Sequence, residues 1–143
     1  MLKNVKYNDL LKLNKEMGDK LDSSIYEVTV LSNIIVNQSK EIMEYVFRNE
    51  GVNAKVKFGD YDNIIQGSQQ HKNSNAIIIF WELSNITDGF QYKVELVNEK
   101  QFDDILKKTK FEIDLVLDNL RKTSLVIFNT FTSLFFSTIE KNK

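Results

Sequence analysis

The stretch AIIIFWEL, from Ala76 to Leu83, is the most apolar strand candidate in the chain and decides the fold. Its nearly continuous hydrophobicity is typical of a strand that is covered on both faces, as central strands of parallel sheets are. We therefore expect a sheet with helices packed on both sides of this strand. Because Phe80 and Trp81 lie inside the stretch, we expect them to pack in the core rather than to stack on a ligand.

Three further segments have the composition of strands. Residues 25–31 (IYEVTVL) are β-branched and apolar, as in a buried strand. Residues 52–58 (VNAKVKF) alternate apolar and polar side chains, and Lys55 and Lys57 lie on the polar side. This alternation predicts an edge strand with one face in water. Residues 124–131 (SLVIFNTF) form the last candidate.

Helical periodicity separates these strand candidates. Apolar residues recur at helical spacing from Val36 to Phe47, Gly51 supplies a left-handed stop, and a longer amphipathic helix covers residues 102–120. Alternating strands and helices with right-handed crossovers produce a parallel sheet with helices on both faces. We predict an α/β fold, a three-layer flavodoxin-like sandwich with a mostly parallel sheet of four to five strands in the order 2-1-3-4.

The remaining segments are less defined by their patterns. Residues 1–22 have helical apolar spacing, with Asn8 or Asp9 as the cap. The sequence leaves open whether this amphipathic helix covers a sheet edge or docks a partner. We interpret residues 67–75 as a polar loop. The tail at residues 132–139 is apolar, and its pattern does not decide between helix and strand.

The composition favours one domain in a reducing compartment. The chain has 143 residues, the usual size of one domain, and we place that domain at 1–143 with its core at about 25–131. The 19 Lys and Arg are balanced by 20 Asp and Glu, so no strong positive field attracts nucleic acid. With no Cys and no apolar run of about 20 residues, we expect a cytoplasmic protein without membrane insertion.

Polar residues gather where the predicted strands end. In open α/β sheets, ligands bind beyond the carboxyl ends of the strands, so we expect these side chains to face one crevice. Hydroxyl, amide and carboxylate groups near helix N-termini suit anion binding or acyl chemistry. The alternative is that each residue only caps a helix or fits a turn. The candidate site consists of Ser32, Asn33, Gly59, Asp60, Asn85 and Asn129.

No pattern in the sequence predicts a metal or cofactor site. The single histidine, His71, lies in a polar segment without a cysteine or second histidine nearby, so we expect it to be exposed rather than to bind metal. The phosphate-binding patterns GxGxxG and GxxxxGK[ST] are absent, which removes the usual nucleotide sites.

The run VTVLSNIIVNQSKEIMEYVFRNEGVNAKVKFGDYDNIIQ (residues 28–66), followed by AIIIFWEL, resembles the N-terminal domain of FkbH-like proteins. In those proteins the domain precedes a phosphatase-like HAD domain. The resemblance covers about residues 25–85 and continues more loosely to Asn129. Its matching features are the turn Leu31-Ser32-Asn33, the helix end Glu50-Gly51 and the run from Phe58 to Asp62.

This resemblance implies an SGNH-hydrolase-like core. It places Ser32 or the adjacent Asn33 at the nucleophile turn, Gly59 in the second block and Asn85 near the third. An SGNH hydrolase also needs an Asp-x-x-His block late in the domain to activate its serine, and no histidine follows His71. The resemblance thus supplies a catalytic candidate, Ser32, without its base.

The resemblance also implies a functional context, because FkbH-like proteins are associated with loading glyceryl units onto acyl carrier proteins. We expect an accessory domain that binds an acyl carrier protein or its acyl or glyceryl group and that is not catalytic alone. Its expected partner is the acyl carrier protein or an adjoining HAD-like domain. Two alternatives stay open. One is an acyl transferase or esterase that takes its base from a partner domain, and the other is a flavodoxin-like module that self-associates as a homodimer.

Overall fold

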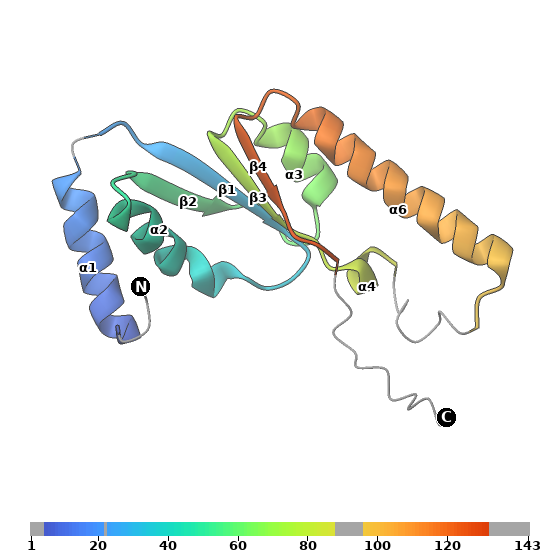
Figure 1. Cartoon of the computed structure of the whole chain (residues 1–143), viewed down its shortest axis with the longest axis horizontal. Helices are drawn as coiled ribbons and strands as arrows, with labels where there is room; N and C mark the ends of the chain where they lie inside the picture. The colour runs from blue at the N-terminus through green and yellow to red at the C-terminus, as the bar shows by residue number, and fades with distance from the viewer. Residues whose placement is uncertain (1–4, 22, 88–95, 132–143) are drawn as a thin grey trace.

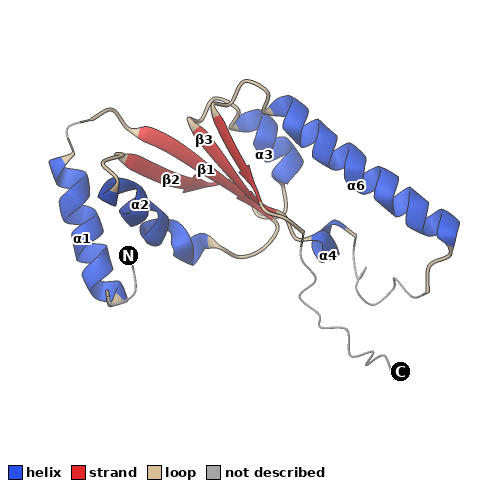
Figure 2. Cartoon of the chain, in the orientation of Figure 1, coloured by secondary structure: helices blue, strands red, loops and turns tan. Residues whose placement is uncertain are grey.

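The computed structural model describes residues 5–21, 23–87 and 96–131. Helices and strands alternate along the chain, as Figures 1 and 2 show. The predicted apolar tail at 132–139 lies outside the described residues. In chain order the elements are α1 (Tyr7–Lys20), β1 (Tyr26–Ser32), η1 (Asn37–Ser39), α2 (Lys40–Asn49), β2 (Ala54–Phe58), α3 (Ile64–Gln70), β3 (Ala76–Phe80), α4 (Leu83–Ile86), α6 (Glu99–Asn119) and β4 (Leu125–Phe128).

The four strands form one parallel sheet in the order β2-β1-β3-β4. β1 pairs with β2 and with β3, and β3 pairs with β4 through a register that begins at Ala76↔Leu125. The predicted strand order and parallel direction are confirmed. The apolar stretch that begins at Ala76 lies between two strands, and β2, with exposed Lys55 and Lys57, forms an edge as predicted.

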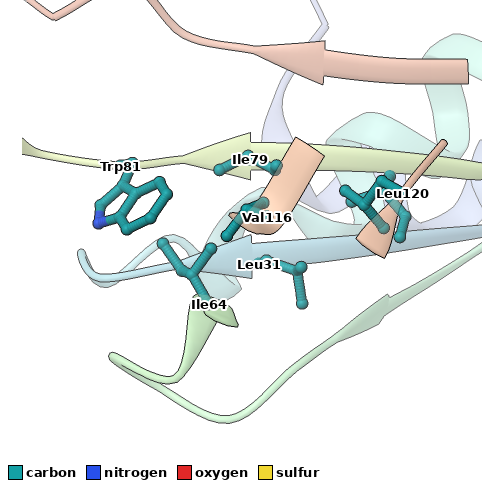
Figure 3. Packing of buried hydrophobic residues seen from close by; sticks show 7 residues of the cluster. Leu31, Ile64, Ile79, Trp81, Val116 and Leu120 are labelled. Carbon is teal, nitrogen blue, oxygen red and sulfur yellow. The ribbon is translucent and has the colours of Figure 1, made fainter. Parts of the chain in front are cut away.

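Helices lie on both faces of this sheet, which confirms the predicted α/β sandwich (Figure 1). On one face α2 packs its Met43 and Phe47 against strand residues that include Val30. On the other face α3 and α6 meet side chains from β1 and β3, and Figure 3 shows this second cluster at close range. The buried members of that cluster are Leu31, Ile64, Ile77, Ile79, Trp81, Val116 and Leu120. Among the described helices, none has the length and hydropathy needed to cross a membrane.

Local signals explain two of the helix ends, the end of α2 and the start of α6. Gly51 has φ +78°, the left-handed value that its predicted role as a stop requires. The side chain of Asn98 accepts a hydrogen bond from the backbone of Gln101, whose side chain accepts one from the backbone of Asn98, so a capping box starts α6. The cap predicted at Asn8 or Asp9 is wrong, because α1 begins one residue earlier and has no side-chain cap.

The polar loop predicted at 67–75 is wrong in its first part, where α3 continues to Gln70. After the buried Ile64, the inward side of this short helix carries small residues, since Gly67 and Ser68 are also buried. A Cβ added at Gly67 would lie 2.8 Å from Cδ2 of Leu31. The absence of a side chain at Gly67 therefore lets α3 approach β1 closely. Because glycine and serine follow Ile64 and Ile65 on the packed side, the apolar pattern of this helix stops after its first turn.

The helix α1 packs on α2. Three side chains join these helices to the edge strand β2, and we call Asn14, Glu44 and Arg48 the edge clasp. Arg48 donates to the backbone and side-chain oxygens of Asn14 (both 2.8 Å) and to the carbonyl of Ala54 (3.2 Å). Glu44 accepts from the backbone N–H of Val56 (3.0 Å). Two clasp residues, Glu44 and Arg48, thus bind backbone groups on the outer side of β2. Because both belong to α2, this helix is the element that satisfies the free hydrogen-bonding groups of the edge strand.

Candidate functional site

A cavity of about 320 Å³ opens at the carboxyl ends of β1 and β2, on the face of the sheet that carries α2. Two predicted site residues, Ser32 and Gly59, line it. The other walls are mostly apolar, with the amide of Asn37 and the phenol of Tyr61 as further polar groups. The complete lining is Val30, Ser32, Ile34, Ile35, Asn37, Phe58, Gly59 and Tyr61.

The hydroxyl of Ser32 is held in a tight local turn. Its Oγ donates to the carbonyl oxygen of Ile34 (2.6 Å) and accepts from the backbone N–H of the same residue (3.0 Å). The side chain therefore follows the hydroxyl turn pattern that is common after strands. Ser32 is 8% exposed, so it reaches the cavity with only a small part of its surface.

Asn33 follows β1 and Asn129 follows β4, and their side chains bind the backbone just after β3, which lies between these two strands. Asn33 accepts from the N–H of Glu82 (2.7 Å) and donates to its carbonyl (3.0 Å). Asn129 makes the same pair of bonds with the backbone of Trp81, at 2.7 Å and 3.1 Å. Each side-chain amide therefore makes the two backbone hydrogen bonds that a neighbouring strand would make, at a residue just after the end of β3. These contacts favour the structural alternative for both asparagines, since both ends of each amide already have a backbone partner.

Asn85 lies at a different cavity from Ser32. Its Nδ2 donates to the carbonyl of Asn33 (2.8 Å), and it lines a hollow of about 220 Å³ together with Asp62 and Glu112. This second hollow lies beside the α3 and α6 face and shares no lining residue with the first. The expectation of one common crevice is therefore wrong for Ser32 and Asn85, although both lie near the carboxyl edge of the sheet.

The loop after β2 contributes residues to both cavities at the carboxyl edge of the sheet. Asp60 is exposed, and Asp62 has φ 55° and donates its backbone N–H to the carbonyl of Ser32 (3.0 Å). Tyr61 reaches the first cavity and Asp62 the second. The sequence prediction missed Tyr61 and Ile35 as lining residues. The run from Phe58 to Asp62 pointed to Tyr61, whereas nothing in the local pattern distinguishes Ile35 from a core residue.

No carboxylate, imidazole or amine lies among the described lining residues beside the hydroxyl of Ser32, because the other polar groups there are the amide of Asn37 and the phenol of Tyr61. His71 lies toward the α3 side of the sheet, where its Cδ2 would be 3.9 Å from a Cβ added at Gly59. It is partly buried rather than exposed as predicted. Within the described ranges, no group of three or more His, Cys, Asp or Glu is placed to hold a metal ion.

No protein-family model matches the chain. No curated protein matches it in sequence. Among solved structures, it is similar to the crystal structure of the N-terminal part of the protein BF1531 from Bacteroides fragilis, which contains a phosphatase domain and is complexed with Mg. The TM-score is 0.66 at 15% sequence identity, and the match covers 96% of this chain and 36% of that one. The chain thus spans about a third of that structure, and the likeness shows a shared fold.

Proposed function

We propose that this chain is an accessory, SGNH-like domain of an FkbH-type protein, which binds a short acyl or glyceryl group carried by an acyl carrier protein. In this proposal the chain does not catalyse acyl transfer alone and works in the cytoplasm. The observation that carries the proposal is the cavity beside Ser32, which combines apolar walls with a hydroxyl but has no base among its lining residues.

The geometry of Ser32 supports binding rather than nucleophilic attack. A serine nucleophile needs a general base within about 2.6–3.2 Å of its hydroxyl. Here the hydroxyl donates to the carbonyl of Ile34 instead. Attack would require this bond to break and the proton to move to a base that the lining residues do not supply. The serine therefore stays an ordinary alcohol, and its oxygen keeps a lone pair that can accept a hydrogen bond from a ligand.

The size and lining of the cavity suit a small acyl group. Ligand sites commonly measure about 300–1,000 Å³ and combine apolar walls with a few polar groups, and this cavity lies at the small end of that range. Val30, Ile34 and Phe58 provide contact surface for the carbon chain. Ser32 and Asn37 provide hydrogen-bonding groups for the hydroxyls of a glyceryl unit.

An adjoining phosphatase-like HAD domain is the second partner in the proposal. The similar structure from Bacteroides fragilis contains a phosphatase domain within a polypeptide of which this fold matches 36%. That arrangement supports a longer protein in which this domain presents the acyl group and the neighbouring domain acts on it.

A binding measurement tests the proposed ligand. Ile35 is 80% exposed and lines the cavity, so Ile35→Glu should leave the fold intact while placing a charge at its rim. Leu96 is 82% exposed and lies outside the cavity lining, so Leu96→Glu is the matched control. Titrating a glyceryl-loaded carrier protein by NMR, we expect at least tenfold weaker binding for Ile35→Glu and unchanged binding for Leu96→Glu. Equal binding by both variants contradicts the cavity assignment.

An esterase assay tests the absence of catalysis. The purified chain should not hydrolyse p-nitrophenyl acetate or butyrate faster than a Ser32→Ala variant. Turnover that disappears with Ser32→Ala would establish the serine-dependent alternative. Turnover that appears only when an HAD-like domain is added would show that the base comes from the partner.

A further inference from the structure

We propose that the seam between α3 and α6 is a binding groove for a neutral carbohydrate of the size of a disaccharide. This groove is separate from the cavity beside Ser32, and the proposal does not depend on the function proposed for that cavity. The helices α3 and α6 lie side by side on one face of the sheet (Figure 1). Two hollows of about 220 and 310 Å³ lie along their seam and share Ile65 and Gln66 as lining residues, so they are neighbouring parts of one groove.

Hydrogen bonds between the two helices brace the groove from within. Asn119 on α6 donates to the hydroxyl of Ser68 on α3 (2.9 Å), and this hydroxyl donates to the carbonyl of Ile65 (2.6 Å). Ser68 is 0% exposed, so the bond from Asn119 lies at the base of the seam. Packed helices usually fill their seam with interlocking side chains. A seam that stays open and is braced by a buried hydrogen bond is instead a preformed groove, as ligand sites usually are.

The walls of the groove carry side-chain amides with unused hydrogen-bonding groups. Three of the six glutamines in the chain, Gln66, Gln69 and Gln70, lie on α3 and line the groove. Within the described ranges, these three side chains have no hydrogen-bond partner. Asn85 and Asn119 bind the protein through their NH₂ groups and leave their amide oxygens unused. The groove therefore presents donors and acceptors together.

The charges along the groove select against anionic ligands. Its ionisable lining residues are Asp62 and Glu112, and no Lys, Arg or His is among the described residues that line it. Lys108 approaches Glu112 to 3.8 Å, but its side chain is 65% exposed and neutralises the carboxylate only weakly. A phosphate, a nucleotide or an acidic peptide would therefore meet negative charge without a compensating cation.

A neutral carbohydrate matches this combination of groups. Each sugar hydroxyl both donates and accepts, as a side-chain amide does, and carboxylates accept hydrogen bonds from hydroxyls. The carbon face of a sugar ring is apolar, and Ile65 and Leu115 provide apolar surface in the groove. The lining residues of α6 extend from Glu112 to Asn119, about 10 Å along the helix axis. This length suits a disaccharide better than a single sugar.

An extended peptide is the competing ligand, because its backbone also combines donors with acceptors. Bound peptides usually add to a sheet edge or place anchor side chains in apolar pockets. This groove lies between two helices and offers no sheet edge, and the hollow that contains Asp62 and Glu112 has a mainly polar surface. These observations favour the carbohydrate.

Titration of the full chain with disaccharides tests the proposal. The probes are maltose, cellobiose and N,N′-diacetylchitobiose, added to isotope-labelled protein and followed by NMR. We expect at least one of them to shift the side-chain NH₂ signals of Gln66 and Gln69, with a millimolar dissociation constant. Trp81 lines the same groove and is the only tryptophan, so the same sugar should change the fluorescence of the protein.

Glutamine variants locate the site. Gln66→Ala combined with Gln69→Ala removes two amides from the groove, and both positions are exposed, so the fold should be kept. We expect at least tenfold weaker binding, measured at the Gln70 side chain and by Trp81 fluorescence. Gln38→Ala is the matched control, because Gln38 is exposed and does not line the groove, and its binding should be unchanged. The backbone signals of the same spectra show whether each variant is folded.

Four outcomes would overturn the proposal. Unchanged spectra with all three disaccharides would show that the groove does not bind this class of ligand. Equal binding by the double variant and the Gln38→Ala variant would place the sugar elsewhere on the protein. Glucose 6-phosphate binding more tightly than the neutral sugars would contradict the selection against anions. Trialanine shifting the glutamine signals more strongly than the disaccharides would assign the groove to a peptide backbone.

Discussion

At the scale of single residues, the polar groups at the strand ends mainly complete the backbone hydrogen bonding of the sheet. Asn33 is the clearest case, because it is 0% exposed and its amide binds both the N–H and the carbonyl of Glu82. Ser32, one residue earlier, binds only the turn that follows it. These two adjacent polar residues at the carboxyl end of β1 therefore have different roles, one structural and one at a cavity.

Removing the amide of Asn33 should lower stability. Asn33→Ala leaves two backbone groups of Glu82 without their partner, and such a loss costs about 1–3 kcal/mol of unfolding free energy. Asn73→Ala is the matched control, because Asn73 is exposed, and it should change stability by less than about 0.5 kcal/mol. Urea unfolding measures both variants. Equal losses would contradict the role assigned to the Asn33 amide.

The pair Glu27 and Lys57 gives a pH-dependent prediction. The hydrogen bond from Lys57 (2.6 Å) and its positive charge lower the pKa of the Glu27 carboxyl. Because the folded pKa lies below the unfolded one, the stabilisation is present above the unfolded pKa. It is lost as the pH falls through the folded pKa. Both side chains are nearly half exposed, so the effect on overall stability is small.

Substitution of each lysine separates these contributions. Lys57→Met should raise the pKa of Glu27 toward its ordinary value, because it removes the hydrogen bond and the larger charge interaction. Lys55→Met is the control and should produce a smaller rise, since Lys55 acts on Glu27 only through a weaker charge interaction. NMR titration of the Glu27 carboxyl carbon measures both. A larger rise in the Lys55→Met variant would show that the hydrogen bond is not the main cause.

At the scale of elements, the sequence predicts strands better than it predicts the short helices. β3 is apolar along its whole length, which indicates a strand buried on both faces. β2 alternates apolar and polar residues, which indicates a strand buried on one face. The helix α3 has apolar core residues only in its first turn, Ile64 and Ile65, because it packs further along through Gly67 and Ser68. Its position depends on Leu31, a residue more than thirty positions away. Close packing through small residues is therefore the information that local periodicity lacks.

The edge clasp makes a prediction at the same scale. Arg48→Ala removes the hydrogen bonds to Asn14 and Ala54 and leaves Glu44 without its positive neighbour. Because hydrogen bonds to charged groups contribute about 1.5–3 kcal/mol, we expect a loss of that size. The backbone amides of α1 should also exchange hydrogen faster than those of α2, since α1 loses its main polar contact.

Arg121→Ala is the matched control for the edge clasp. Arg121 pairs with Asp118 at 2.9 Å, but the two side chains are 76% and 61% exposed, so the loss should be no more than about 1 kcal/mol. Urea unfolding and amide hydrogen exchange measure the two variants. If α1 keeps its protection in the Arg48→Ala variant, packing against α2 holds the helix and the polar clasp does not.

At the scale of the whole molecule, the candidate site could be predicted only in part. Parallel strand direction follows from the sequence, so the grouping of Ser32, Gly59 and Asn85 at one edge of the sheet is correct. The side of the sheet on which each lies depends on strand register. Asn33 and its partner Glu82 are 49 residues apart, and no local pattern shows that the amide is already used by the backbone. Two cavities therefore replace the single predicted crevice.

The two apolar clusters share one sheet, and this arrangement predicts a single unfolding transition. Trp81 is the only tryptophan and is 4% exposed in the cluster beneath α3 and α6, so its fluorescence reports on that face. Val30 is 1% exposed on the α2 face, and Val30→Ala should cost about 1–3 kcal/mol. Because β1 and β3 contribute to both clusters, neither cluster can persist when the strands separate.

We therefore expect Val30→Ala to lower the urea midpoint of Trp81 fluorescence and of far-ultraviolet circular dichroism by the same amount. Ile79→Val, on the face that carries Trp81, is the matched change and should again move both midpoints together. A fluorescence midpoint that stays in place while the circular dichroism midpoint falls in Val30→Ala would mean that the α3 and α6 face unfolds separately. In that case the sheet would not couple its two sides, and the cavity beside Ser32 could open while the opposite cluster remains folded.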